Sequence, residues 1–310
     1  MSLFGILSIN KPAGCTSRDV VNRVERVVSP AKAGHAGTLD PLASGVLVIC
    51  VGKATRLIQY VQQMRKQYRA TFLLGHRSDT DDTEGEVHAI SDAPICDRVE
   101  LEQVLPRFVG ETQQRPPVYS AIKLGGRRAY QLARQGRAPE LATRAVTIHD
   151  ISIERYDYPE LMLTIECGSG TYIRALGRDI AAALGTAAVM TALQRTAIGQ
   201  FHINDALALE NLSAESLSQY LVSPLAAVPH LPRVVLTDTD LMEVRNGRPV
   251  RQRPADIPAA HAASPSERES VGEWAAVDRK GELVAILRQK NVGQLWPKLN
   301  LATTSGSNES

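Results

Sequence analysis

One segment of the chain places a single carboxylate among glycines and a proline, which control the shape of the backbone. It reads G-H-A-G-T-L-D-P-L-A-S-G over residues 34–45, and its carboxylate is Asp40. The glycines permit tight turns, and Pro41 restricts the backbone of the residue before it. A carboxylate presented in this way can act as a nucleophile or a base. The alternative is an Asx-turn in which Asp40 only binds neighbouring amides, and this segment alone leaves both interpretations open.

Three further side chains have types that suit a substrate pocket. Tyr68 stands in a predicted strand, and Tyr172 and Arg174 stand at the start of a predicted helix. Taken alone, each has a commoner structural role, because a strand tyrosine usually packs in the core and a helix arginine usually faces solvent. A lone histidine such as His35 is usually structural too, and it predicts no metal site.

No pattern in the chain predicts a metal or a nucleotide cofactor. The acidic run at 79–86 lacks the EF-hand spacing, so we expect a solvated acidic turn there. Gly52 and Lys53 resemble part of a P-loop, but the earlier glycine and the Ser or Thr after the lysine are missing. The cysteines form no C-x-x-C pair, which argues against a zinc site and a disulfide framework; they are Cys15, Cys50, Cys96 and Cys167.

Basic residues gather in one stretch although the overall charge is nearly balanced. The chain carries a formal net charge of +2. Between residues 113 and 145, however, there are seven basic residues and one acid. A solvated charged face would also explain such a run, but the near absence of acids favours a surface that tracks phosphates, whose binding weakens as the salt concentration rises.

Length and composition are those of an ordinary folded protein. The 310 residues are 44% hydrophobic and 22% charged, and this length allows a large domain plus a smaller one. The longest apolar run, 46–51, is far shorter than the roughly 20 residues of a membrane span. The N-terminus has no basic leader and no small-residue cleavage site, so we expect a cytoplasmic protein.

Periodicity predicts a mixture of strands and helices without a regular alternation. Apolar runs predict strands at 5–9, 46–51, 68–74 and 161–167. Apolar residues at helical spacing predict helices at 17–28 and 172–184. This mixture favours an α+β fold over a doubly wound sheet.

The pattern changes after residue 224 to short strands separated by turn signals. We expect a main domain at 1–230 and a small all-β module at 231–300. The insertion at 254–270 is rich in Pro, Ala, Ser and charge, which predicts a mobile loop. The tail 301–310 is expected to be disordered.

Six ordered motifs between residues 5 and 196 resemble those of the tRNA pseudouridine synthase B (TruB) family. The core motif G-x-L-D-P-x-A-x-G-x-L is matched from Gly37 to Leu47. The other motifs are G-I-L-S-I-N-K-P with a following T-S, K-Q-Y-R-A, R-P-P-x-Y-S-A-x-K, C-G-S-G-T-Y-I-R and L-Q-R-T, which begin at Gly5, Lys66, Arg115, Cys167 and Leu193. Residues 244–250 and 276–286 resemble a PUA-type RNA-binding domain.

The resemblance implies both a fold and an activity. The fold would be that of a pseudouridine synthase, with a central mixed, largely antiparallel β-sheet flanked by helices, and a small C-terminal β-barrel-like PUA-type module. The activity would be that of the bacterial stand-alone enzyme, which turns a uridine in the T loop of tRNA, conventionally position 55, into pseudouridine. This isomerisation oxidises nothing and acquires no outside group, so no cofactor is implied.

The resemblance also assigns roles to four of the residues above. Asp40 would be the essential aspartate, acting as a nucleophile or opening a glycal route, and Arg174 would pair with it and keep it ionised. Tyr68 would stack on the target base. Tyr172 would line the pocket near the sugar or the C5 proton.

The same resemblance implies contacts around the flipped nucleotide and along the RNA. Leu193 would close the base pocket, and His35 would hold the RNA backbone around the extruded nucleotide. The stretch at 113–145 would be a mobile basic thumb that closes on the T stem-loop. Its expected RNA contacts are Arg115, Lys123, Arg127, Arg128 and Arg134.

Two other functions fit the same scaffold. One is a catalytically idle protein that binds or folds tRNA, although the intact Asp40, Tyr68 and Arg174 count against it. The other is a guide-RNA-dependent pseudouridine synthase subunit, which the lack of an extended Lys-rich tail disfavours. For the stand-alone enzyme we expect a monomer.

Overall fold

The structure is a computed structural model that describes residues 3–120, 123–124, 126–133, 139, 141–253, 272–291 and 293–302. Three predictions therefore fall wholly or largely outside the described residues: the mobile loop at 254–270, the tail beyond residue 302 and the side chain of Arg134.

An 11-stranded mixed sheet runs through the larger part of the chain. Its main path is β14 (Leu207–Ala208), β1 (Gly5–Lys11), β3 (Ser44–Val51), β12 (Ala188–Ile198), β4 (Lys66–Leu74), β11 (Glu160–Cys167), β10 (Arg144–Asp157) and β7 (Gly110–Gln114). The strands that pair beside this path are β2 (Ala33–His35), β13 (Phe201–His202) and β15 (Leu221–Val222). Only the β1–β14 and β3–β12 pairs of this described sheet are parallel, so the prediction of a mixed, largely antiparallel sheet is confirmed.

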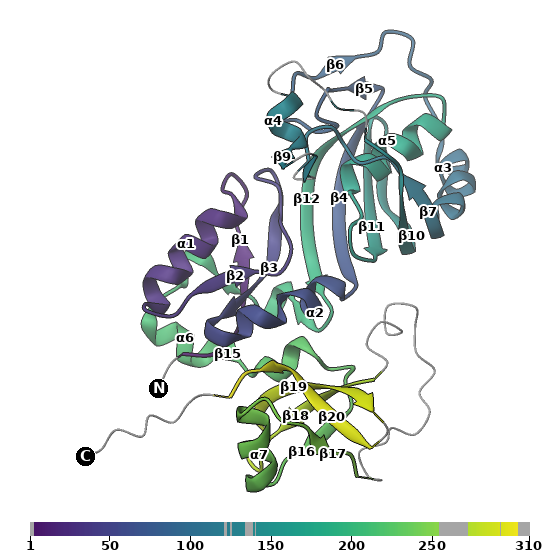
Figure 1. Cartoon of the computed structure of the whole chain (residues 1–310). Helices are drawn as coiled ribbons and strands as arrows, with labels where there is room; N and C mark the ends of the chain where they lie inside the picture. The colour runs from purple at the N-terminus through teal and green to yellow at the C-terminus, as the bar shows by residue number, and fades with distance from the viewer. Residues whose placement is uncertain are drawn as a thin grey trace.

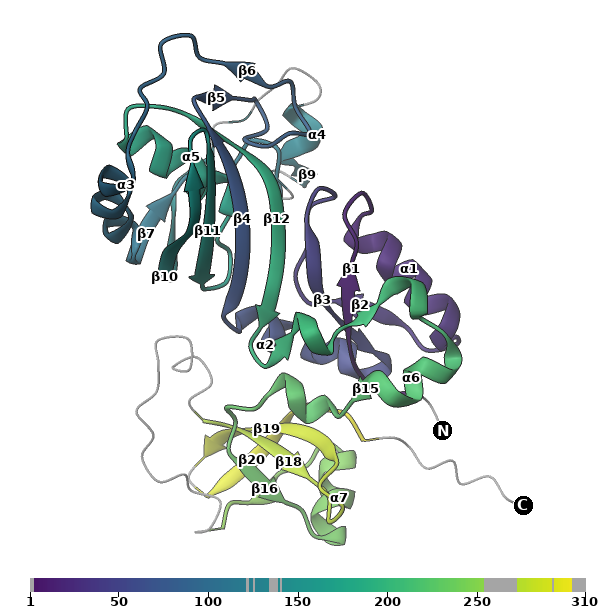
Figure 2. The ribbon, with the colours of Figure 1, turned by 180° about the vertical axis from the view of Figure 1, so that it is seen from behind.

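Helices cover the sheet in two groups. Figures 1 and 2 show α1 (Ser17–Val28) and α6 (Ala214–Tyr220) beside β1 and β3, whereas α3 (Arg98–Val104) and α5 (Ile173–Ala183) lie against the half with β4, β11, β10 and β7. Two separate hydrophobic clusters fill these halves. The crossing from one half to the other is made by β12, which pairs with both β3 and β4.

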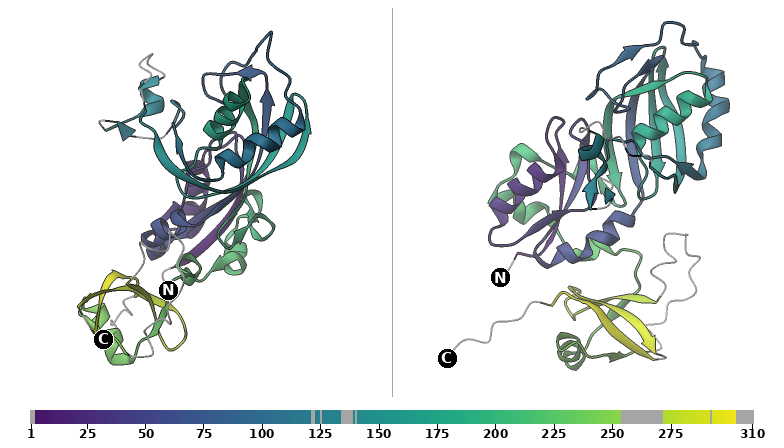
Figure 3. Two further views of the ribbon diagram at one scale, coloured as in Figure 1. Left: turned by 90° about the vertical axis from the view of Figure 1, so that its right-hand side faces the viewer. Right: turned by 45° about the horizontal axis from the view of Figure 1, so that its top comes forward.

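The remaining short elements connect these parts. They are α2 (Ile58–Gln63), α4 (Ala129–Ala133), the strand pairs β5 (His76–Arg77) with β6 (His88–Ala89) and β8 (Lys123–Leu124) with β9 (Arg127–Arg128), and the 3-10 turns at Gly52–Leu57, Leu105–Phe108, Ile203–Asp205, Leu209–Asn211 and Pro224–Ala227. Figure 3 (left) shows α4, which lies between β7 and β10 in chain order, projecting from the body of the molecule.

The two predicted long helices form for reasons that are visible in the sequence. Thr16 caps α1 through a capping box with Asp19, which satisfies amides that the first turn leaves without partners. In α5, Gly177 lets the helix pack closely on β4, because a Cβ atom there would lie 2.0 Å from the ring of Phe72. Both helices are confirmed within one residue of their predicted ends.

The C-terminal part folds into a second, curled sheet of five strands. Its strands are β16 (Arg233–Val235), β18 (Glu273–Val277), β19 (Leu283–Asn291), β20 (Gln294–Asn300) and β17 (Val250–Arg251), in that order. The expectation of an all-β module is wrong at one place, because α7 (Asp238–Arg245) follows β16. Thr237 and Asp240 form a capping box that starts this helix.

This module packs on the main part of the chain beneath α2 (Figure 1). The Tyr60 hydroxyl donates to the buried Glu273 carboxylate at 2.7 Å, and Lys298 donates to the same carboxylate at 2.6 Å. One hydrophobic cluster also contains side chains of both parts, among them Leu57 and Ile286. The predicted boundary at 230/231 stays a prediction, but any such boundary crosses a packed interface.

Candidate active site

Asp40 lies in the loop between β2 and β3, as its glycine-rich surroundings suggested. Its carbonyl accepts a hydrogen bond from the amide of Ala43 at 3.0 Å, which closes a tight turn around Pro41. The Asp40 side chain is 36% exposed. The carboxylate is therefore available to a ligand and is not used up by the turn itself.

Two polar side chains, Lys11 of β1 and Ser17 of α1, form hydrogen bonds with the backbone of this loop. The Ser17 hydroxyl accepts from the amide of Leu39 at 2.9 Å and donates to the carbonyl of the same residue at 3.0 Å. The Lys11 ammonium donates to the carbonyls of Cys15 at 2.7 Å and Pro41 at 3.5 Å. Burial lowers the pKa of Lys11. Its hydrogen bonds to carbonyls offset part of the cost of desolvating the ammonium group.

Arg195, from β12, holds the other end of the loop. Its side chain is 2% exposed and donates to the carbonyl of Val46 at 2.7 Å and to that of Gly37 at 3.1 Å. Gly45 makes this approach possible, because its φ is +101° and a Cβ atom there would lie 2.2 Å from the carbonyl oxygen of Arg195. The backbone on both sides of Asp40 is thus fixed by buried cations.

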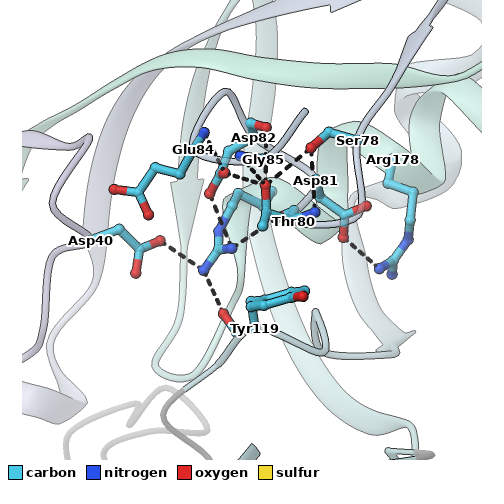
Figure 4. A network of polar contacts seen from close by, with 10 residues as sticks. Asp40, Ser78, Thr80, Asp81, Asp82, Glu84, Gly85, Tyr119 and Arg178 are labelled. Carbon is cyan, nitrogen blue, oxygen red and sulfur yellow. Dashed lines mark hydrogen bonds and ion pairs between the residues drawn. The ribbon is translucent and has the colours of Figure 1, made fainter. Parts of the chain in front are cut away.

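A second buried arginine binds the Asp40 carboxylate directly. Arg174 stands in the first turn of α5 and is 6% exposed. One of its terminal nitrogens, Nη2, lies 3.0 Å from Asp40 Oδ2 and donates to the carbonyl of Tyr119 at 3.1 Å. The other, Nη1, lies 3.1 Å from Asp82 Oδ2 and donates to the carbonyl of Thr80 at 2.9 Å (Figure 4). The predicted pair of Asp40 and Arg174 is therefore present.

The contacts of Arg174 explain how a cation is tolerated at that place. A positive side chain near a helix N-terminus is disfavoured by the helix dipole, and burial adds a desolvation cost. Two carboxylates and two backbone carbonyls surround the guanidinium and offset both terms. The same contacts fix its plane, and the guanidinium in turn fixes Asp40 Oδ2.

The acidic turn at 79–86 is solvated only in part, because Asp79, Glu84 and Glu86 are exposed as predicted and Asp82 is not. Asp82 is fully buried. Its Oδ1 accepts from the Thr80 hydroxyl at 2.6 Å and from the Glu84 amide at 3.0 Å, while Oδ2 pairs with Arg174. Sequence reasoning missed Asp82 as a site residue, because a run of acids at 79–86 gives no sign that an arginine far along the chain neutralises one of them. Nearby, Asp81 pairs with Arg178 at 2.9 Å.

Glu84 adds a further carboxyl group at the mouth of the site. Figure 4 shows its side chain beside Asp40. Partial desolvation, together with the carboxylates of Asp82 and Asp40, raises the pKa of Glu84. The Asp40 carboxylate thus lies near one arginine, Arg174, and two further acids, Asp82 and Glu84.

Tyr68 and Leu193 lie in the core cluster that includes Leu39 of the Asp40 loop. Each of the two side chains is 8% exposed. Burial raises the pKa of Tyr68, and the positive charge of the neighbouring Arg195 opposes this rise. Both predicted pocket residues are therefore near the Asp40 loop, on adjacent strands β4 and β12.

His35 and Tyr172 stand at the edges of this arrangement. His35 ends β2, five positions before Asp40, and its Nδ1 is buried without a hydrogen-bond partner. Burial, and then the charge of Arg195, lowers the pKa of His35. Tyr172 is half-buried at the N-cap of α5, two residues before Arg174.

The predicted RNA contacts are only partly described. Arg115 is exposed in the segment that follows β7, and its carbonyl accepts from Arg178 at 2.7 Å. The strands β8 and β9 pair Lys123 with Arg128 and place Arg127 beside them. The side chains of these three residues are outside the described part of the structure.

Within the described ranges, no group of three or more His, Cys, Asp or Glu side chains could hold a metal ion. None of the helices in those ranges combines the length and hydropathy that crossing a bilayer would need. All four cysteines are free thiols. The candidate site consists of a partly exposed carboxylate, its buried arginine and a second, buried carboxylate.

Comparison with known proteins identifies the family. Two family models match, TruB family pseudouridylate synthase (N terminal domain) over residues 25–173 and tRNA pseudouridylate synthase B C-terminal domain over residues 174–229. Relatives named tRNA pseudouridine synthase B include one from Dehalococcoides mccartyi, 41% identical over 87% of this chain and 94% of its own length. Another, from Caulobacter vibrioides, is 40% identical over 94% of both chains.

A solved structure extends the similarity to the whole fold. A chain in the crystal structure of a Cbf5-Nop10-Gar1 complex superposes with a TM-score of 0.72, at 26% identity, over 96% of this chain and 84% of that one. This match covers the PUA-type module as well as the main sheet. With the family models and the close relatives, it shows that the chain belongs to the TruB family of pseudouridine synthases.

Proposed function

We propose that the chain converts uridine into pseudouridine in the T loop of tRNA, at conventional position 55, with Asp40 as the catalytic carboxylate. The observation that carries this proposal is the partly exposed Asp40 carboxylate held by a buried arginine, in a chain whose close relatives are named tRNA pseudouridine synthase B. We place the protein in the cytoplasm, with the tRNA that it would modify. It would act as a monomer, since every group invoked below comes from one chain.

The reaction explains why one catalytic carboxylate is enough. The N1–C1′ bond breaks, the uracil rotates, and C5 joins C1′ while the C5 proton leaves and N1 takes up a proton. Glycosidases commonly need a second carboxyl group to protonate the leaving oxygen. Uracil leaves as a delocalised anion and needs no such acid. Asp40 therefore attacks C1′ or removes the 2′ proton, and Arg174 holds its carboxylate in place for either step.

The remaining site residues bind the flipped nucleotide. Extruding a base from a folded loop costs a few kcal/mol, which stacking and hydrogen bonds must offset. Tyr68 supplies the stacking face and Leu193 closes the pocket beside it. Tyr172 lines the pocket, and His35 supports the backbone of the extruded nucleotide.

Basic side chains of the thumb hold the RNA stem by its phosphates. These are Arg115, Lys123, Arg127, Arg128 and Arg134. Since such contacts release counterions, affinity falls as the salt concentration rises. The PUA-type module contacts tRNA outside the T stem-loop.

Mapping the modified position tests the proposed substrate. The pure protein, without a guide RNA, is incubated with an unmodified tRNA transcript, and pseudouridine is located in the product. We expect a single modified position in the T loop. Pseudouridine elsewhere in the tRNA would contradict the position. Tight binding with no pseudouridine would favour the idle tRNA-binding protein, and activity that depends on an added guide RNA would favour the guided subunit.

Replacing Tyr68 with Leu is expected to lower the rate on bound tRNA by about 10²-fold or more, because the stacking face and any proton acceptor beside the base are lost. Tyr68→Phe keeps the ring and removes the hydroxyl, so its rate separates the contribution of stacking from that of a proton acceptor. A single-turnover assay at saturating enzyme measures both rates.

The matched control for Tyr68 is Phe72→Leu. Phe72 lies on the same strand and in the same core cluster, so its replacement reproduces the loss of a buried ring away from Asp40. It should lower the melting temperature and leave the rate nearly unchanged. If Tyr68→Leu behaves like Phe72→Leu, Tyr68 only packs in the core.

A further inference from the structure

Two residues at the base of the thumb both contact Tyr172. Gln114 ends β7 and Arg144 begins β10, and the two are direct partners in the pairing of these strands. The chain between them is the segment with the basic residues. The thumb is thus attached to the sheet at the point where the sheet meets the start of α5.

Gln114 holds the backbone of Tyr172. Its side chain is buried, with 2% exposure. The carboxamide Oε1 accepts from the Tyr172 amide at 2.8 Å, and Nε2 donates to the Tyr172 carbonyl at 3.1 Å. Tyr172 is the N-cap of α5 and has no capping bond from its own side chain. Gln114 therefore pairs the Tyr172 amide, which the helix start would otherwise leave without a partner. It also adds a second donor to the Tyr172 carbonyl, which already accepts from the Leu176 amide at 3.0 Å.

Arg144 holds the ring of Tyr172. Its guanidinium carbon lies 4.6 Å from the centroid of that ring, a cation–π arrangement. The same guanidinium donates to the carbonyl of Gly170, in the turn before α5. In the sequence, Arg144 belongs to the basic run at 113–145 with the expected phosphate-binding residues. In the structure, its guanidinium contacts the Tyr172 ring and the Gly170 carbonyl.

We propose that Gln114 and Arg144 are positioning residues that set the place of Tyr172, one through its backbone and the other through its ring. This proposal rests on the proposed function, because it gives Tyr172 its role in the pocket. It implies that Arg144 acts on the rate of reaction and not on the affinity for RNA. An arginine that only contacted a phosphate would instead act on the affinity for RNA and not on the rate on bound RNA.

Kinetics and RNA binding of Arg144→Gln separate these two roles. We expect the single-turnover rate at saturating enzyme to fall by about 10-fold or more, because small displacements of a pocket residue reduce rates strongly. The dissociation constant for tRNA and its salt dependence should stay unchanged. Arg144→Lys keeps the charge but not the planar group, so it should not restore the rate. Gln114→Glu should lower the rate in the same way, since a carboxylate would face the Tyr172 carbonyl.

A double-mutant cycle links the effect to Tyr172. In a Tyr172→Ala background, adding Arg144→Gln should lower the rate little further, because the ring that Arg144 positions is absent. Arg155→Gln is the matched control: this exposed arginine stands on the same strand, with its ion pairs at Asp157 and Glu160. It should leave rate and affinity as they are.

Three results would overturn the proposal. Weaker tRNA binding with a salt slope shallower by roughly 0.7–0.9 and an unchanged rate on bound RNA would make Arg144 a phosphate contact. Additive losses in the cycle would remove the link to Tyr172. Without RNA, a fluorine label on the Tyr172 ring should change its NMR resonance in Arg144→Gln. An unmoved resonance would exclude the contact whether or not the wild type modifies tRNA, so this failure is distinct from failure of the proposed function.

Discussion

Asp40→Asn is expected to lower the rate of pseudouridine formation by at least about 10³-fold, the scale on which enzymes lose activity when a reacting group is removed. Asparagine has nearly the same shape and its side-chain oxygen still accepts from Arg174, but it can neither attack the sugar nor remove a proton from it. Turnover above a few per cent of the wild-type rate would contradict the assignment.

Two measurements show whether a loss of activity in Asp40→Asn comes from misfolding or weak tRNA binding and not from the missing carboxylate. Asp40 is partly exposed on a loop, so the melting temperature of Asp40→Asn and its affinity for tRNA should stay close to those of the wild type. The matched control is Asp79→Asn, which removes an exposed carboxylate from the neighbouring acidic turn. It should retain nearly full activity.

Arg174→Lys is expected to lower the rate by about 10²-fold, because one ammonium cannot hold both carboxylates and both carbonyls that the guanidinium holds, and displacements of a catalytic group are costly. It should also destabilise the protein, since Asp82 is buried and would lose part of its pairing. The loss should stay below the roughly 3–5 kcal/mol that follows complete removal of a partner, because the charge is kept. Single-turnover rates and chemical unfolding measure the two effects.

Arg178→Lys is the control for this substitution. Arg178 lies one turn further along α5, is 31% exposed on its side chain and pairs with Asp81. A change there should reduce stability slightly and leave the rate nearly intact. If Arg174→Lys kept the wild-type rate, the arginine would serve the fold alone, and the account of how Asp40 is oriented would fail.

Local patterns were enough to predict the main elements and the Asp40 loop. Helix 17–28 is defined by a capping box and its valine spacing, and strand 46–51 by a continuous apolar run. These signals lie within a few residues of one another and need no tertiary information. The pairing of Asp40 with Arg174 is different, because 134 positions separate the two residues, and it was expected only from the resemblance to a family.

Residues whose role depends on distant partners were missed. Asp82 reads as part of a solvated acidic run until α5 brings Arg174 against it. Arg195 was expected only as part of a motif, and its bonds to Gly37 and Val46 appear only when β12 lies beside β3. Helix α7 was missed because its exposed residues give little amphipathic pattern over eight positions.

We propose that this chain breaks the glycosidic bond of a uridine in tRNA through Asp40. Release of tritium from tRNA labelled at C5 of its uridines tests it most directly, because C5 loses its hydrogen when it joins C1′. Wild-type protein and Asp40→Asn are compared in single turnover at saturating enzyme. The account predicts stoichiometric release by the wild type and no measurable release by Asp40→Asn in an equally well-formed complex. Equal release by both proteins, or none by the wild type bound to unmodified tRNA, would contradict it.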